Sequence, residues 1–527
     1  MAKRKKKAKA GDGTRPGGQQ AGTESAIKKD ITQLDSSSFR VFSGLVVLFF
    51  LAGLLAMNDT TSIWHGAEAW TLWQSVSDQP NSWLTAFLHA AYDDGPISVF
   101  YLRFFGIFFF LLTLAGTFFI GKKLFGKNTI WLALLLVGAS LLVPNIAKRA
   151  TADIYLFSAQ VLFGMSTLIY LKTPSDPWKF LWWAALWVSF IIEPLGSLLF
   201  AIPFLLVLMR SHSQGKILLN WQVWLPALAG VLVLTALQPS PWFDPALSFG
   251  WLRSGYLKYL SWQLIAVLPF IGFAIGGIRD LFYKVKRGEE FSLLLTAWIL
   301  SALLSQSLTL SWVLALLAAK QMQLFFNPKY PFAAWVRGPA ILQLVFAFFV
   351  IAMGMIYGFW SFRGIGFRSL LAASGLYWGM CFLGVIGLYG FNHRLLIGGP
   401  ILAGVLLTML SWFQIGPILE SQRHWSPEIV NMAESRQSED QPESLQLYYR
   451  PGLDPFPGMA VYGQDQMRKV ELLSTEAALQ SAISSPAGIL VLEQTTAGQM
   501  NIPASADTLS GWNDQLEAVR YQLIVPQ

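Results

Sequence analysis

The chain has 527 residues, of which 54% are hydrophobic, 14% aromatic and only 13% charged, and its mean hydropathy is +0.47. Soluble proteins carry about a quarter charged residues, so this composition excludes a water-soluble protein, a disordered chain and a collagen. The single cysteine, Cys381, excludes an intramolecular disulfide. The composition predicts an α-helical polytopic membrane protein.

The first 40 residues are strongly basic, with ten Lys or Arg against four Asp or Glu. Such a charged, Gly-rich segment cannot bury an apolar core, so we expect residues 1–40 to form a disordered cytoplasmic tail near anionic headgroups. The tail lacks the form of a signal peptide. The first apolar run, 41–57, is therefore expected to remain as a membrane anchor.

Residues 41–415 contain apolar stretches long enough to cross a hydrocarbon core of about 30 Å. They lie near 41–57, 97–120, 129–144, 154–171, 180–209, 220–238, 260–278, 291–319, 339–358, 369–390 and 395–415. The stretch 180–209 is interrupted by Glu193-Pro194, and both it and 291–319 are counted as two spans. The pattern thus predicts a transmembrane domain of about 13 helices.

The distribution of Lys and Arg predicts the orientation of this domain. With a cytoplasmic N-terminus, the inside loops hold fifteen Lys or Arg and the outside loops before residue 416 hold six. An odd number of spans then places residues 416–527 outside. This segment contains six basic and fourteen acidic residues. The net charge of +8 therefore indicates orientation, and no nucleic-acid partner is expected.

Two outside segments are too large to be simple connections. Residues 58–96 hold four tryptophans among polar residues, which is typical of helices lying in the membrane interface. In the tail, 445–449, 470–473, 489–492 and 519–525 are typical of short strands, and 475–484 is typical of a helix. We expect interfacial helices in the first outer loop and a small C-terminal α/β domain outside the membrane.

No nucleotide or metal motif accompanies these spans. The sequence has no Walker A loop, no GxGxxG after a strand and no HExxH or CxxC pair. ATP-driven transport is therefore not expected, no cofactor is assigned and no metal site is named, although a requirement for a divalent metal stays open.

Acidic residues gather in the first outer loop, which contains no Lys or Arg. Glu68, Asp59 and Asp94 are its candidate functional residues. Carboxylates opposite cations suit a reaction at a lipid phosphate, because cations hold the anionic leaving group and a carboxylate accepts a proton. As alternatives, Asp59 is an exposed residue at the end of a span, Glu68 a solvated acid, and Asp94 a turn residue before Pro96.

The candidate phosphate-binding cations lie in the next outside loops. Lys148 and Arg149 precede the fourth span, and Arg253 and Lys258 precede a later one. Lys148 and Arg149 are also explained as interfacial residues whose charged ends reach water, but their outside location favours a function.

Two further acids border the apolar spans. Asp153 is expected to cap the fourth span, with orientation of a neighbouring group as the alternative. Glu193 is costly between apolar runs, so a functional or ion-paired role is favoured, with a break that reaches water as the alternative.

Three local patterns carry a resemblance to a known family. They are Trp64–Trp70 (WHGAEAW), Ala150–Phe157 (ATADIYLF) and Glu193–Gly196 (EPLG). Together with the layout of spans, loop and tail, they resemble the integral-membrane GT-C glycosyltransferases, in particular the protein O-mannosyltransferase and lipid A aminoarabinose transferase-like group. The resemblance covers almost the whole chain.

The resemblance implies inverting transfer of a sugar from a polyprenyl-phosphate carrier to a lipid, glycan or protein acceptor at the outer face of a bacterial inner membrane. Glu68, or else Asp59, would accept the proton, and the four cations would neutralise the phosphate. The chain departs from the family pattern at three positions: Ala67 replaces the first acid of an Asp-Glu pair, Asp94 replaces a lysine, and Glu193 replaces the lysine of a later turn.

These departures motivate a second hypothesis, a catalytically degenerate GT-C-fold protein that acts as a binding or assembly partner in the cell envelope. A lipid or solute transporter is a third and weaker hypothesis, because the spans show no clear inverted repeat.

Overall fold

The computed structural model of the chain describes residues 37–56, 84, 87, 88, 90, 99–211, 215–236, 251–325, 327, 330–361 and 367–415, and in the C-terminal region 444–448, 469–473, 476–484, 489–493, 508–512 and 518–524. Residues 1–36 of the basic tail and most of the first outer loop, where the interfacial helices are expected, lie outside the described residues, whereas 37–40, expected to belong to the disordered tail, begin the first helix. Asp59, Glu68 and Asp94 also lie outside the described residues.

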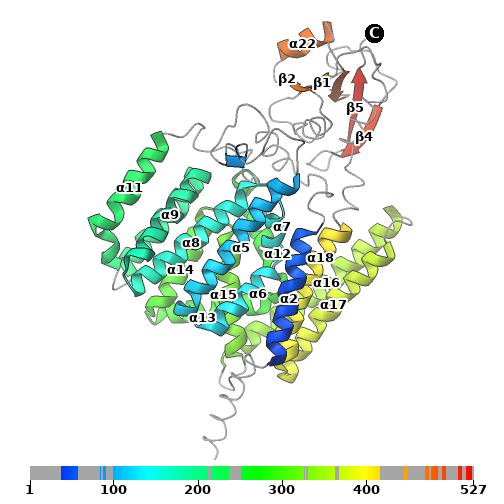
Figure 1. The fold of residues 1–527 in the computed structure, drawn as a ribbon. Helices are drawn as coiled ribbons and strands as arrows, with labels where there is room; N and C mark the ends of the chain where they lie inside the picture. The colour runs from blue at the N-terminus through cyan, green and yellow to red at the C-terminus, as the bar shows by residue number, and fades with distance from the viewer. Residues whose placement is uncertain are drawn as a thin grey trace, which may run out of the picture.

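The described residues between 37 and 415 lie almost entirely in helices (Figure 1). The first group is α2 (Ser37–Leu55), α5 (Val99–Leu124), α6 (Lys127–Gly138), α7 (Val143–Ala147), α8 (Ala152–Lys172), α9 (Asp176–Ile192), α10 (Pro194–Ser211), the 3-10 helix η2 (Gly215–Leu219) and α11 (Trp221–Ala236). The second group is α12 (Trp251–Val267), the 3-10 helix η3 (Leu268–Phe270), α13 (Ile271–Lys286), α14 (Glu290–Leu304), α15 (Thr309–Leu324), α16 (Ala333–Ser361), α17 (Phe367–Gly390), α18 (His393–Leu410) and the π-helical turn η4 (Ser411–Ile415).

Every predicted apolar stretch contains a helix, but the helices differ in length. Six of the described helical segments are long and apolar enough to cross a membrane: Ser37–Leu55, Arg103–Leu124, Ala152–Lys172, Tyr256–Lys286, Ala333–Met353 and His393–Phe413. Five shorter apolar helices accompany them, among them Pro194–Arg210 and Trp221–Ala236. A membrane protein is confirmed in this sense, whereas the count of thirteen crossings stays a prediction.

The predicted span 129–144 differs most from the structure. Its helix, α6, has 12 residues and ends at Gly138, after which the chain turns into the five-residue helix α7. Twelve residues rise about 18 Å, which is less than the thickness of the hydrocarbon core. The apolar run continues because the turn and α7 are buried inside the protein, with Pro144 in the first turn of α7.

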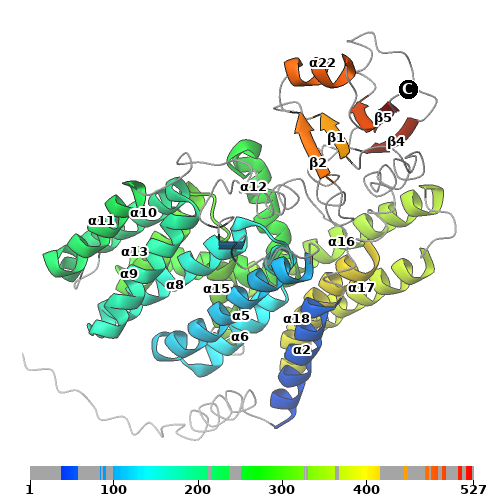
Figure 2. The ribbon, with the colours of Figure 1, turned by 45° about the horizontal axis from the view of Figure 1, so that its top comes forward.

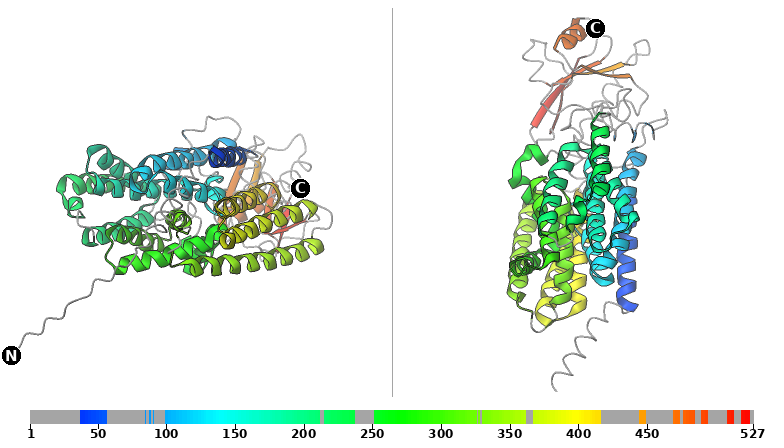
Figure 3. Two further views of the ribbon diagram at one scale, coloured as in Figure 1. Left: turned by 90° about the horizontal axis from the view of Figure 1, so that it is seen from below. Right: turned by 90° about the vertical axis from the view of Figure 1, so that its left-hand side faces the viewer.

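The helices form a bundle with an extended outline (Figures 1 and 2). Seen from below, the blue-to-cyan and the green helices lie in two rows, with the yellow helices α16 to α18 at one side (Figure 3). The helix α8 is central, because almost all its side chains are buried, and α15 is similarly enclosed. Fully buried tryptophans such as Trp298 and Trp312 fill the space around them.

The C-terminal strands form one mixed five-stranded sheet of order β2-β1-β3-β5-β4. The strands are β1 (Ser444–Tyr448), β2 (Lys469–Leu473), β3 (Ile489–Glu493), β4 (Thr508–Trp512) and β5 (Ala518–Ile524), with α22 (Glu476–Ser484) between β2 and β3. The strand β1 pairs in parallel with β2 and β3, while β5 is antiparallel to β3 and β4. These elements coincide with the expected ones except β4, which the sequence pattern missed because Ser510 and Gly511 interrupt it.

Candidate functional site

Charged side chains gather where α5 begins and the turn from α7 to α8 passes. Lys148 is the C-cap residue of α7, and Thr151 is the N-cap residue of α8. The turn lies close to α5 because Gly106 has no side chain: a β-carbon there would lie 3.4 Å from the backbone oxygen of Arg149. Arg103 of α5 is buried in this region, and only 1% of it is exposed.

The contacts of Lys148 point toward α2. Its Nζ donates to the backbone oxygens of Gly53, at 3.0 Å, and Ala56, at 2.5 Å, and lies 4.6 Å from the ring centre of Trp412. These carbonyls belong to the last turn of α2 and the residue after it, where a cation is favoured by the helix dipole. Burial, and secondarily the charge of Arg103, lower the pKa of Lys148 to about 8. Lys148 therefore ties the end of α2 to the α7–α8 turn.

The expectation that Asp153 caps the fourth span is wrong. Thr151 holds the N-cap position, and Asp153 lies inside the first turn of α8. Its side chain is buried, with 6% exposed. The position still suits an acid, because the N-terminal end of a helix favours negative charge.

Glu193 forms the break between α9 and α10. It has extended backbone angles, as residues before a proline do, and Pro194 begins α10 without needing an N–H partner. Its carboxylate folds back over Gly196, where a β-carbon would lie 3.0 Å from Oε2. The predicted break between the two apolar runs is confirmed, and Glu193 lies in the turn that it forms.

Asp153 and Glu193 interact electrostatically. Burial first, and then the negative charge of Asp153, raise the pKa of Glu193 to about 7. Two carboxyl groups brought together in this way disfavour double ionisation. A carboxyl group with a pKa near 7 is suited to accept a proton at neutral pH.

A polar cluster lies deeper in the bundle, around the turn between α14 and α15. The hydroxyl of Ser307 bonds Gln160 of α8, and Ser311 donates to Oε1 of Gln263 at 2.6 Å. The hydroxyl of Tyr259 donates to the backbone oxygen of Ser307 at 2.8 Å. These side chains join α8, α12 and the α14–α15 turn.

Several atoms of this polar cluster have no protein partner among the described residues. They include Nε2 of Gln160, Nε2 of Gln263, Oε1 of Gln306, and the hydroxyls of Ser158 and Ser301. Buried polar groups are almost always paired, so these atoms are left to bond ordered water or a polar ligand. Gln160 lies seven residues, about 10 Å, along α8 from Asp153.

Sequence reasoning missed this cluster. Its signal was the run Ser305-Gln306-Ser307 in the middle of the apolar stretch 291–319, which was interpreted only as a connection between two spans. Gln306 adopts φ 52°, which is uncommon outside glycine and asparagine and marks a sharp turn.

The structure describes the other predicted phosphate-binding residues, Arg253 and Lys258, less completely. Arg253 lies in the first turn of α12, and its side chain is outside the described part of the chain. Lys258 is exposed on the same helix, while its neighbour Tyr259 is buried. The structure thus brings together Lys148 with Arg103 and Asp153 with Glu193. Within the described residues, no group of three or more His, Cys, Asp or Glu side chains could hold a metal ion.

Comparison with known proteins identifies the fold. No protein-family model matches the sequence, and no curated protein is similar to it. Among solved structures, ArnT from Cupriavidus metallidurans in the apo state aligns with a TM-score of 0.60 and 13% sequence identity over 93% of this chain and 100% of that one. ArnT from the same organism bound to undecaprenyl phosphate aligns over the same shares with a TM-score of 0.55 and 13% identity. The expected GT-C-like fold is confirmed.

Proposed function

We propose that this chain is a membrane glycosyltransferase that transfers a sugar from a polyprenyl-phosphate-linked donor to an acceptor at the outer face of a bacterial inner membrane. The observation that supports it most directly is the likeness to ArnT, which extends over 93% of this chain and includes the form with undecaprenyl phosphate. A chain that shares this fold over 93% of its length has the layout to hold a lipid carrier of the same kind.

The proposed reaction is an in-line displacement at the sugar. A hydroxyl oxygen of the acceptor attacks the anomeric carbon, the bond from that carbon to the phosphate oxygen breaks, and polyprenyl phosphate leaves with the bonding electrons. The hydroxyl proton passes to a carboxylate. The stereochemistry at the anomeric carbon inverts, because attack and departure occur on opposite faces.

Two sets of carboxylates are candidates for the base that accepts the hydroxyl proton. Glu68, with Asp59 as the second choice, is proposed as the base by resemblance to the family motif, and Asp94 is a further candidate for the same site. Asp153 and Glu193 support the same role from inside the bundle, since the raised pKa of Glu193 suits proton transfer near neutral pH.

The cationic side chains are proposed to bind the departing phosphate. Arg149, Arg253 and Lys258 are proposed to neutralise its charge, with the forked guanidinium groups suited to two phosphate oxygens. Lys148 has two of its three N–H donors on carbonyls of α2, so its part is to position the α7–α8 turn that carries Arg149.

A direct test uses a strain deleted for the gene. The strain is complemented with the natural chain, with Glu68→Gln or with Asp153→Asn, and its envelope glycans are compared at equal protein level. We expect Glu68→Gln to lower transfer at least about a hundredfold, as loss of a general base does. Glu290→Gln, at an exposed carboxylate in the first turn of α14, is the matched control and should leave transfer unchanged.

The outcome distinguishes the two functions that remain. If deletion changes no lipid-linked or envelope glycan, or if Glu68→Gln and Asp153→Asn both restore every glycan in full, the transferase proposal is overturned. A degenerate GT-C-fold assembly partner is then the better description. Ala67, which stands where the family has its first acid, and the structural engagement of Lys148 favour that second function.

A further inference from the structure

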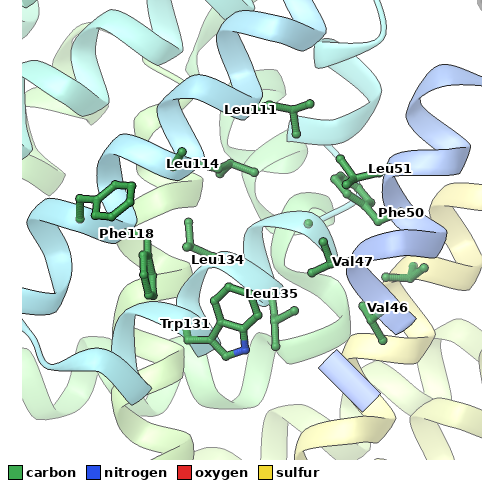
Figure 4. Close-up of a pocket in the computed structure, with 14 residues that line it drawn as sticks. Val46, Val47, Phe50, Leu51, Leu111, Leu114, Phe118, Trp131, Leu134 and Leu135 are labelled. Carbon is green, nitrogen blue, oxygen red and sulfur yellow. The ribbon is translucent and has the colours of Figure 1, made fainter. Parts of the chain in front are cut away.

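An apolar pocket of about 290 Å³ lies between α2, α5 and α6 (Figure 4). Figure 4 shows Phe50 of α2, Leu114 and Phe118 of α5, and Trp131 and Leu134 of α6 around one space. Every side chain that lines it is aliphatic or aromatic, and Gly138 completes the wall. No charged group takes part in the lining.

The pocket reaches the outer surface of the bundle. Phe119 belongs to its lining and is 59% exposed. The helices α2 and α5 are both long and apolar enough to cross a membrane, so the medium around this opening is hydrocarbon. Apolar cavities of this kind do not hold water, and the filler available at this depth is the chain of a lipid.

The pocket occupies the part of the bundle near the basic ends of its helices. On α5 it extends from Leu111 to Phe119, a rise of about 12 Å. Phe119 lies only three residues before Lys122, which is in the last turn of the helix. The pocket therefore ends about 17 Å from Lys122, which is close to half of a core about 30 Å thick, or one leaflet.

Exposed cations surround the basic end of the pocket. Lys122 and Lys123 end α5, Lys127 begins α6, and Arg40 lies in the first turn of α2. The Nζ of Lys122 lies 5.0 Å from the ring centre of Phe119, which places the ammonium group directly at the rim. The sequences 37–55 and 99–138 contain no Asp or Glu, so no acid of these helices offsets this charge.

We propose that the α2–α5–α6 pocket binds one acyl chain of an anionic phospholipid, with the lipid phosphate held by Lys122 and Lys127. An apolar slot one leaflet deep with exposed lysines at its mouth matches both parts of such a lipid, and basic pockets between membrane helices bind anionic headgroups. The site lies at the opposite end of α5 from Arg103 and is therefore distinct from the proposed transfer site.

The acyl-chain part is tested by filling the pocket. The purified, delipidated full-length protein is titrated with phosphatidylglycerol, and bound lipid is counted by native mass spectrometry. We expect Leu114→Trp to weaken binding at least tenfold. Leu112→Trp, on the exposed side of α5 at 53% exposure, is the matched control and should bind as the natural chain does. If Leu114→Trp does not fold, the smaller filling change Ala115→Leu answers the same question.

The headgroup part is tested by removing charge. Lys122→Ala should weaken phosphatidylglycerol binding about fivefold, as expected for one lysine at a membrane surface, and leave phosphatidylcholine binding unchanged. Lys286→Ala is the control, because the Nζ of Lys286 lies 4.8 Å from the ring centre of Phe282 in the same way, but Lys286 belongs to α13, which contributes no residue to the pocket.

Three results would overturn the proposal. They are equal binding of phosphatidylglycerol and phosphatidylcholine, unchanged binding in both pocket-filling variants, and displacement of phosphatidylglycerol by undecaprenyl phosphate at equal concentration. The last result would assign the pocket to the sugar carrier.

Discussion

Glu193 illustrates how a single residue combines a backbone role with a chemical one. Pro194 favours an extended conformation at Glu193, and in the resulting turn its carboxyl group is largely removed from water and interacts electrostatically with Asp153. An acid in this setting holds its proton more tightly than in water, because both burial and a neighbouring negative charge disfavour ionisation. The same residue therefore ends α9 and titrates near neutral pH.

The raised pKa of Glu193 predicts a pH-dependent stability. The folded protein binds this proton with a pKa of about 7, against an ordinary value of 4.5, so the free energy of unfolding falls as pH rises from about 4.5 to 7. We expect the loss between pH 5 and pH 8 to be about 2 kcal/mol smaller in Glu193→Gln than in the natural chain. Thermal unfolding in detergent measures this difference.

The matched control for this measurement is Glu290→Gln, which removes an exposed carboxylate at the first turn of α14. It should reproduce the pH dependence of the natural chain. The same dependence in Glu193→Gln would show that the Glu193 carboxyl does not carry the effect.

At the scale of elements, the connection between α5 and α6 depends on one glycine. Gly126 has φ 89°, in the region that residues with a β-carbon rarely adopt, and it is followed at once by Lys127, where α6 begins. The connection leaves α5 and α6 side by side, and both helices line the apolar pocket. Strain in the connection at Gly126 would therefore affect the packing of both α5 and α6.

Replacing Gly126 by alanine should lower the free energy of unfolding by about 1 kcal/mol, because a β-carbon is disfavoured at positive φ. The matched variant is Gly375→Ala in α17, a helix without an internal proline, and nothing described lies within 4 Å of the added carbon. Its stability should rise by up to about 1 kcal/mol. Equal shifts in the two variants, measured by thermal unfolding, would contradict this account of the turn.

At the scale of the whole molecule, basic residues gather at one end of the helical bundle. The basic residues Lys122, Lys127, Lys284 and Lys286 lie at helix ends that the positive-inside rule places in the cytoplasm, while the sheet is drawn beyond the other end (Figures 1 and 3). This arrangement predicts that the basic helix ends lie in the cytoplasm and the sheet lies on the opposite side of the membrane.

Single-cysteine labelling tests this orientation. In a Cys381→Ser background, which removes the buried native thiol, we expect Lys286→Cys to react with a membrane-impermeant maleimide only in inverted vesicles. Ser510→Cys in β4 should react only in right-side-out vesicles or intact spheroplasts. Labelling of both positions from one side would mean that the sheet lies on the same side as the basic loops, contrary to the predicted odd number of crossings.

Local patterns in the sequence accounted for much of the fold. Apolar runs of about 20 residues identify buried or lipid-facing helices, and Glu193-Pro194 identified the break between α9 and α10, because both signals depend on neighbouring residues alone. The short α6 was not predicted. Its apolar run continues through a buried turn, and hydropathy does not distinguish a turn enclosed by other helices from a continuing span.

The sequence by itself determined that this chain enters a membrane, which helix ends are basic and where the strands of the tail lie, since composition and short-range periodicity decide these properties. Only the tertiary structure decided that Lys148 holds the end of α2, that Asp153 and Glu193 interact electrostatically, and that a polar cluster and an apolar pocket exist. These features join residues tens to hundreds of positions apart. Their energies come from burial and contact in three dimensions, which no local pattern records.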